Sequence, residues 1–192
     1  MQIIVKSCHG ISVVPLESRL LADRKIYLQG EITDASACDF EQKIDYLLSE
    51  DPEKEINLYI NSPGGVVTGG LHIYDIVKSI NAPLNMWCRG MAASMAAIIF
   101  AGGQNGRRFI LPHSKVMIHE PLIQGGIGGS ASSIHRTAES IMETRKLTIE
   151  LLAADTGKSR LAVEKAIAFD NYMNAQEAVE FGIADKVVGS LR

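Results

Sequence analysis

The chain has 192 residues, of which 46% are hydrophobic and 21% charged, and its net charge is −3. This length and composition predict one globular domain with a substantial core. The weak negative charge, without a run rich in lysine or arginine, argues against a nucleic-acid partner and against an anionic membrane surface.

Strand-like and helical patterns alternate along the chain. Strands are predicted over residues 3–5, 11–14, 25–28, 56–60, 84–88, 108–111 and 115–118, the first two as an arm or hairpin. Helices are predicted over residues 34–49 (capped by Thr33 or Asp34), 71–80, 91–101, about 134–154 and 161–168, and from an Asn174–Glu177 capping box to Gly182. Turns or loops are predicted over residues 61–65, 102–106 and 124–133. The alternation predicts a single-domain α/β fold with mainly parallel strands.

Cysteine usage and apolar runs favour a cytoplasmic protein. Cys8, Cys38 and Cys88 are odd in number and lack a CxxC pair, so we expect free thiols, no disulfide framework and no metal site. The first residues lack the basic front and long apolar stretch of a signal peptide. The apolar run 91–101 is shorter than the about 20 residues that a membrane span requires, so no membrane segment is expected.

A serine and a histidine lie where predicted elements meet. Ser94 stands among small residues at a junction of strand and helix, where free N–H groups favour a developing anion. The same pattern also suits a small residue that only packs a helix start. His119 follows the apolar run 116–118, at an expected sheet edge. Serine with histidine forms an activated nucleophile, but residues 92–96 do not match the GxSxG elbow of α/β-hydrolases.

Two further features would complete a serine hydrolase. Gly64 and Gly65 follow a predicted strand, so their backbone N–H groups can approach a ligand, and the N–H groups of Gly65 and Met95 are candidate oxyanion donors. An acid must orient the histidine. Three downstream aspartates are candidates: Asp155, Asp170 and Asp185. Two aromatic residues flank Asp170 and could bury it, but the residue pattern does not choose among the three.

Six short segments carry a resemblance to a known family. They read Ser-Arg-Leu-Leu at 18–21, Ile-Asn-Ser-Pro-Gly-Gly at 60–65, Ala-Ala-Ser-Met at 92–95, Leu-Pro at 111–112, Val-Met-Ile-His at 116–119, and Glu-Ala-Val-Glu at 177–180 with Gly182. In this order they resemble the ClpP family, the proteolytic subunits of the ATP-dependent Clp proteases, over about residues 16–190.

The resemblance implies an α/β fold of the ClpP/crotonase type, with stacked ββα units and a protruding handle helix. Residues 1–15 would form an N-terminal axial arm and residues 16–192 a single peptidase domain. The implied activity is that of a serine endopeptidase. Its site would consist of the nucleophile Ser94, the base His119, the acid Asp170, and Gly64, Gly65 and Met95 around the oxyanion and substrate.

The resemblance also implies partners. The family forms heptameric rings that stack into a tetradecamer, and unfolded polypeptides are cleaved inside the chamber. An AAA+ unfoldase of the ClpX, ClpA or ClpC type feeds that chamber and uses the ATP, so this chain would need no cofactor. The unfoldase docking site would include Tyr59, Trp87, Phe109 and Leu111.

The chain departs from the family pattern in several places. The arm over residues 1–15 is unusual, and the loop after Pro121 is rich in glycine. Asn171 stands where the family has an arginine that pairs between rings, and Ala131 or a neighbouring serine replaces its acidic partner. Polar residues replace apolar ones in the docking site at Asn57, Ser79 and Arg89. The glycine-rich loop and Asn171 predict a weak joint between rings, and so a second paralogue that depends on another ClpP ring. The polar residues in the docking site predict weaker or altered unfoldase docking.

Other functions fit parts of the sequence. A catalytically silent subunit would act as a ring scaffold or regulator, although the three candidate catalytic residues are all present. A crotonase-type acyl-CoA enzyme would share the fold, but its chemistry does not rely on serine, histidine and aspartate. A protease of the signal-peptide-peptidase kind is disfavoured because the chain has no membrane segment.

Overall fold

A computed structural model describes residues 1–7, 10–123, 125–126 and 128–189 of the chain. The strands are β1 (Gln2–Ser7), β2 (Gly10–Pro15), β3 (Lys25–Ile32), β4 (Ile56–Gly65), β5 (Leu84–Ala93), β6 (Arg108–Ile110), β7 (Lys115–Ile118), β8 (Asn171–Met173) and β9 (Lys186–Val187). The helices are α1 (Leu16–Ala22), α2 (Asp34–Glu50), α3 (Val67–Ser79), α4 (Met95–Ala101), α5 (Ala131–Thr156), α6 (Arg160–Ile167) and α7 (Ala175–Phe181). None of the helices in this described part is both long and apolar enough to cross a membrane.

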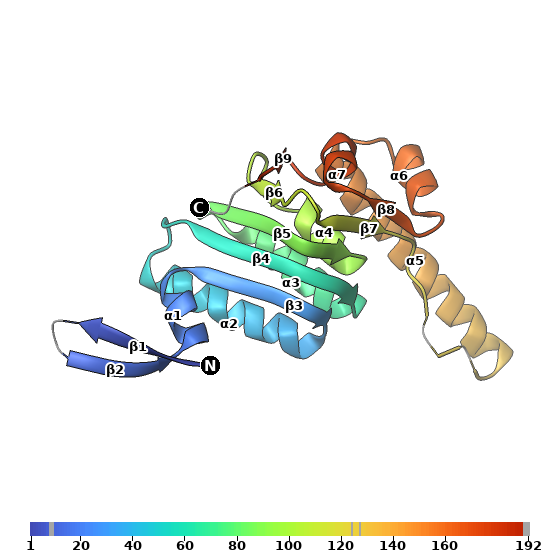
Figure 1. Cartoon of the computed structure of the whole chain (residues 1–192). Helices are drawn as coiled ribbons and strands as arrows, with labels where there is room; N and C mark the ends of the chain where they lie inside the picture. The colour runs from blue at the N-terminus through green and yellow to red at the C-terminus, as the bar shows by residue number, and fades with distance from the viewer. Residues whose placement is uncertain (8–9, 124, 127, 190–192) are drawn as a thin grey trace.

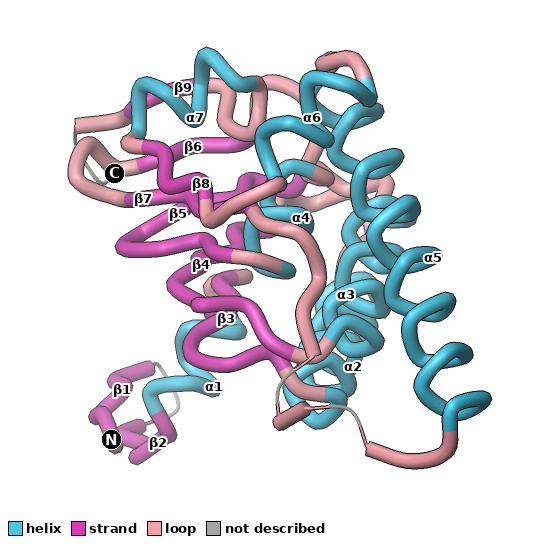
Figure 2. The backbone as a smooth tube through the Cα atoms, turned by 90° about the vertical axis from the view of Figure 1, so that its right-hand side faces the viewer, coloured by secondary structure: helices cyan, strands magenta, loops and turns pink. Residues whose placement is uncertain are grey.

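The main sheet is almost entirely parallel. Its order is β3-β4-β5-β6-β9, and every neighbouring pair along this path is parallel. The far end of β5 pairs in parallel with β7, and β8 adds to β7 as the antiparallel strand. Helices α2, α3, α4 and α5 lie on one side of the sheet (Figure 2), and α5 projects well beyond it (Figure 1). The predicted α/β class with mainly parallel strands is confirmed.

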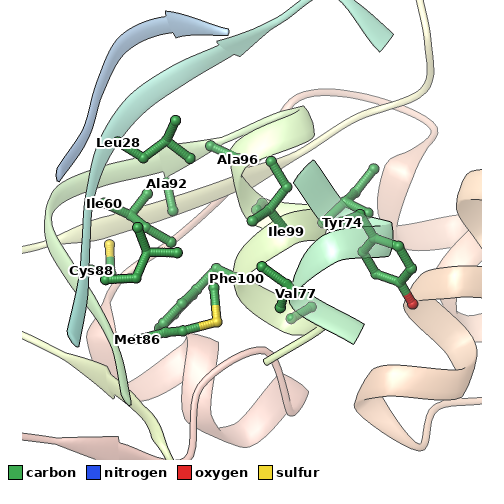
Figure 3. Packing of buried hydrophobic residues seen from close by; sticks show 14 of the residues in the cluster. Leu28, Ile60, Tyr74, Val77, Met86, Cys88, Ala92, Ala96, Ile99 and Phe100 are labelled. Atoms are coloured by element: carbon green, nitrogen blue, oxygen red, sulfur yellow. The ribbon is translucent and has the colours of Figure 1, made fainter. Parts of the chain in front are cut away.

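The core lies between the sheet and this helical layer. Alternate side chains of β4 point into it, while the residues between them face the other side of the sheet. Every residue of α4 is buried. Figure 3 shows Ile99 and Phe100 of α4 between the sheet residues Ile60 and Met86 and the side chain of Tyr74 on α3. A helix buried on all sides needs a continuous apolar sequence, which explains the run that follows Ser94.

Several strands are longer than predicted, and the extensions of β4 and β5 lead to the candidate site. β4 includes residues 61–65, which were predicted to be a turn, and β5 includes residues 91–93, which were predicted to be helical. Pairing in register explains both differences, since Ser62 pairs with Ala92 and the end of β4 pairs with the end of β3. The structure also adds α1, β8 and β9, starts α3 four residues early, and starts α5 three residues early.

The first strands form an antiparallel hairpin, as one of the two sequence interpretations had it. The hairpin lies to one side of the main sheet (Figure 1). The N–H of Leu16 donates to the carbonyl oxygen of Met1, which ties the start of α1 to the first residue. Most side chains of β2 are exposed. Cys8 lies outside the described residues, whereas Cys38 and Cys88 are free thiols.

Candidate active site

Ser94 lies at the abrupt junction between β5 and α4. Its backbone has φ 53° and ψ −124°, a conformation that residues with a Cβ rarely adopt. Three backbone hydrogen bonds hold it there: its N–H donates to the carbonyl oxygen of Met117 at 2.8 Å, and its carbonyl accepts from Ala97 at 3.0 Å and from Ile98 at 3.3 Å. The surrounding sheet and helix therefore impose this strained turn, as is typical of functional sites.

His119 follows β7 directly and faces Ser94. Its Nε2 lies 2.9 Å from Ser94 Oγ, within hydrogen-bonding distance. Parallel pairing of Ala93 with Met117 brings the ends of β5 and β7 together. Only 15% of the imidazole is exposed. The sheet thus joins two residues that are 25 positions apart in sequence.

Asp170 completes the chain of contacts from the other side of the histidine. Its Oδ1 lies 3.2 Å from His119 Nδ1. The last pair of the β7–β8 ladder is Ile118 with Asn171, and one further step of this antiparallel register sets His119 opposite Asp170. The side chain of Asp170 is 60% exposed, and Phe169 and Tyr172 are also exposed. The expectation that the aromatic neighbours bury Asp170 is therefore wrong, because their rings lie at the surface.

Asp155, another candidate acid, is engaged elsewhere. It accepts hydrogen bonds from the Tyr74 hydroxyl at 2.8 Å and from Lys78 Nζ at 2.9 Å. Burial, and next the bond to Asp155, raise the pKa of Tyr74 above its usual value. Asp155 therefore fastens α5 to α3.

Asp185 is also engaged away from the site. Its carboxylate accepts from the Arg108 guanidinium, with one pair of atoms 2.6 Å apart, and from the backbone N–H of Arg108 at 2.9 Å. Burial tends to raise the pKa of Asp185, but the hydrogen bonds from Arg108 outweigh it and leave the pKa below its usual value. Of the three candidate aspartates, Asp170 is thus the one within hydrogen-bonding distance of His119.

Gly64 and Gly65 bring β4 against the serine. Both have positive φ, of 91° and 153°. A Cβ on Gly64 would lie 2.6 Å from the carbonyl oxygen of Ala93 and 2.7 Å from Ser94 Cβ, and a Cβ on Gly65 would overlap the backbone of Ile32. Glycine is therefore required at both positions on steric grounds.

The buried hydroxyl of Ser62 and the backbone N–H of Met95 complete this side of the site. Ser62 Oγ donates to the carbonyl oxygen of Gly30 at 2.6 Å and accepts from the N–H of Gly64 at 3.1 Å, a supporting role that the sequence interpretation missed. Met95 is the first residue of α4, where backbone N–H groups have no acceptor within the helix. Its N–H is therefore a donor available at the serine.

A cleft of about 640 Å³ opens in front of these residues. Its lining includes Ser94, His119, Gly64, Gly65 and Met95, so it unites five of the six predicted site residues. The remaining lining is mainly apolar: Pro63, Val66, Val67, Ile98, Met117, Pro121 and Leu122, with Glu31 and Thr148. A second cavity of about 470 Å³ shares three of these residues and extends along α5. Such a lining suits apolar side chains of an extended ligand.

The residues predicted to dock an unfoldase lie on the sheet face opposite the helical layer. Strand register places Tyr27, Tyr59, Trp87 and Phe109 in one row, with ring centroids 4.6–6.3 Å apart between neighbours. We call this set the aromatic row. Leu111 is half-buried just beyond β6.

Of the three polar residues noted for the docking site, Asn57 and Arg89 lie beside the aromatic row, whereas Ser79 lies on α3 in the helical layer on the other side of the sheet (Figure 2). Asn57 Oδ1 accepts from the Trp87 indole N–H at 3.0 Å and from Asn85 Nδ2 at 3.3 Å, so this amide oxygen is satisfied. The Arg89 guanidinium lies 3.8 Å from the centre of the Tyr59 ring, and its buried Nε has no hydrogen-bond partner within the described residues. Ser79 lies at the end of α3, where its hydroxyl donates to the carbonyl oxygen of Ile76.

The chain matches one family model, described as Clp protease, over residues 9–190. The match includes every residue discussed in this subsection. The described part of the chain holds no group of three or more His, Cys, Asp or Glu that could bind a metal ion.

Proposed function

The chain belongs to the Clp protease family, and on this basis we propose that it is a serine endopeptidase whose catalytic residues are Ser94, His119 and Asp170. Family membership supports a ClpP-like peptidase with the α/β fold of the ClpP/crotonase type. The observation that carries the catalytic proposal is the continuous line of contacts, 2.9 Å from Ser94 Oγ to His119 Nε2 and 3.2 Å from His119 Nδ1 to Asp170 Oδ1.

The proposed reaction is acyl transfer. His119 Nε2 accepts the proton of Ser94 as Oγ attacks the peptide carbonyl, and then donates it to the departing amine. Asp170 keeps the imidazole in the tautomer with a proton on Nδ1 and stabilises the imidazolium. A water molecule, deprotonated by the same histidine, then attacks the acyl-enzyme and releases the second product.

The proposed oxyanion donors are the N–H groups of Gly65 and Met95, with Gly64 beside the substrate. The negative oxygen forms next to the serine, where the first turn of α4 and the end of β4 meet in the cleft. Donors fixed in the backbone need no reorganisation when the charge develops, and loss of one such donor typically costs about 100- to 1,000-fold in turnover.

We extend the proposal to ring assembly and to an unfoldase that docks on the aromatic row. Family membership supports ring oligomers that work with AAA+ unfoldases. Trp87→Ala should then lower unfoldase-dependent degradation of a folded protein while hydrolysis of a short peptide continues. Equal loss of both activities would contradict this docking site.

Reaction with a fluorophosphonate tests the catalytic proposal directly. Intact mass should show one adduct per chain for the native protein and none for Ser94→Ala. An adduct that persists in Ser94→Ala, or a native protein that neither reacts nor cleaves peptides as a complete ring, would overturn the proposal.

A further inference from the structure

The contact between His119 and Asp170 lies one residue past the last hydrogen-bonded pair of β7 and β8. The β7–β8 ladder ends at Ile118 with Asn171, one position short of the pair. Asp170 is 60% exposed, and its contact with His119 is the one hydrogen bond that its carboxylate makes among the described residues. The register sets the two residues opposite each other, but neither burial nor a ladder hydrogen bond fixes the Asp170 side chain there. Contacts between the two segments that continue past the ladder therefore help to determine its position.

These two segments meet again just after the pair. The N–H of Glu120, next to His119, donates to the carbonyl oxygen of Ile167 at the end of α6. This single backbone bond closes a small loop that contains both His119 and Asp170. It leaves the separation of the two segments dependent on the side chains around it.

Arg145 of α5 bridges both segments from outside. Its Nε donates to Glu120 Oε2 at 2.8 Å, and its NH1 group donates to Glu164 Oε1 on α6 at 3.0 Å. The hydrogen bond to Glu120, and next the one to Glu164, raise the pKa of Arg145, so the guanidinium keeps its charge. A planar guanidinium that binds two carboxylates fixes their relative positions better than a flexible ammonium does.

We propose that Arg145 is a positioning residue, which holds the segment of His119 and the segment of Asp170 at the separation that their contact requires. The inference rests on the proposed function for its catalytic meaning. The proposed role of Arg145 would connect α5 to the catalytic residues. The same helix also reaches the cleft directly, because Thr148, one turn after Arg145, lines it. Displacement of α5 at Arg145 would then alter the alignment of Asp170 without any contact with the substrate.

The test compares rates of fluorophosphonate labelling at Ser94 in the full-length protein. The variants are Arg145→Met, Asp170→Asn and the double variant, with Lys146→Met as the matched control. Lys146 is the next residue of the same helix, is exposed, and makes no ion pair within the described residues. Exposed ion pairs contribute little to stability, so Arg145→Met should fold.

We expect Arg145→Met to slow labelling by at least about tenfold, since misplacement of a catalytic group by 1 Å can cost about 100-fold. Lys146→Met should label at the native rate. In the Asp170→Asn background, Arg145→Met should change the rate by less than about twofold, because the contact it protects is already lost. A general loss of folded protein would instead slow both backgrounds equally, and that result, or a native rate in Arg145→Met, would overturn the inference.

Crystal structures of the native protein and Arg145→Met separate this inference from the proposed function. The distance from His119 Nδ1 to Asp170 Oδ1 should lengthen beyond hydrogen-bonding range in the variant. Absence of an adduct at Ser94 in the native protein would overturn the proposed function. The distance from His119 Nδ1 to Asp170 Oδ1 would still decide the role of Arg145. An unchanged distance would overturn the positioning role whatever the reactivity.

Discussion

The backbone N–H of Ser94 donates a hydrogen bond to the carbonyl oxygen of Met117, two residues before His119. This bond continues the parallel pairing of β5 with β7 to the serine itself. The separation of Ser94 and His119 is therefore set by the sheet and does not depend on flexible side chains alone. Substitutions that leave the sheet intact should change the chemistry of the site without moving its backbone.

Asp170→Asn should lower peptide hydrolysis by roughly 10³- to 10⁴-fold, because an amide cannot hold the imidazole in the required tautomer. Asp155→Asn is the matched control, since Asp155 binds Tyr74 and Lys78 away from the cleft. Its activity should stay close to native. Steady-state hydrolysis of a fluorogenic peptide measures both variants, and comparable losses in the two would contradict the role proposed for Asp170.

Gly64→Ala should lower hydrolysis by about 100-fold or more. The added Cβ would lie 2.6–2.7 Å from Ala93 and Ser94, so the serine must shift, and a shift of about 1 Å can cost this much. Gly157→Ala is the control, because Gly157 also has a positive φ but an added Cβ there meets no atom within 4 Å. The control should lose about 1–2 kcal/mol of stability and retain its activity. Native activity in Gly64→Ala would show that the backbone can give way there.

Asp185→Asn should lower the free energy of unfolding by about 3 kcal/mol at neutral pH, because it leaves the buried Arg108 guanidinium without its counter-charge. The pKa of Asp185 is lowered in the folded protein. Its stabilisation is therefore full above the unfolded pKa of about 3.9 and is lost as the pH falls through the lower folded value. Urea unfolding should show the two proteins converging below about pH 4. Asp23→Asn, in the exposed pair with Arg19, should cost less than about 1 kcal/mol.

Cys88 should resist alkylation in the folded protein, whereas Cys38 should react. Burial raises the pKa of Cys88 to about 12, against a smaller opposite effect of a hydrogen bond with Ser114, so little thiolate forms at pH 8. In a Cys8→Ser background, iodoacetamide should modify one thiol per folded chain and two after unfolding. Rapid modification of two thiols in the folded chain would show that the core around Cys88 opens.

Local sequence pattern was sufficient for several features of the fold. The alternation of strands and helices predicted the parallel sheet, and the capping box of Asn174 and Glu177 and the helix end at Gly182 are confirmed. The sequence pattern predicts a helix over residues 91–93, because a buried strand and a buried helix are both continuously apolar and periodicity cannot separate them. Pairing with β7 decides that stretch, and pairing is a property of the folded chain.

The candidate site shows the same division between local and long-range information. Ser94 stands out in the sequence because it lies among small residues where an apolar helix begins, and His119 because it closes an apolar strand-like run. The choice of Asp170 over Asp155 and Asp185 depends on which residue the antiparallel β8 sets opposite His119. No local sequence pattern pointed to Arg145, because its proposed role depends on hydrogen bonds to Glu120, earlier in the chain, and to Glu164, later in the chain.

The place of β8 in the chain has a consequence for folding. Asp170 meets His119 across 51 residues, and the segment between them includes α5 and α6. Such non-local contacts form late, because the entropy of a long loop must be lost before the contact stabilises anything. During synthesis, Ser94 and His119 therefore emerge from the ribosome well before the Asp170 carboxylate. The proposed triad stays incomplete until the segment after α6 is made, so chains that end before Asp170 lack a complete active site.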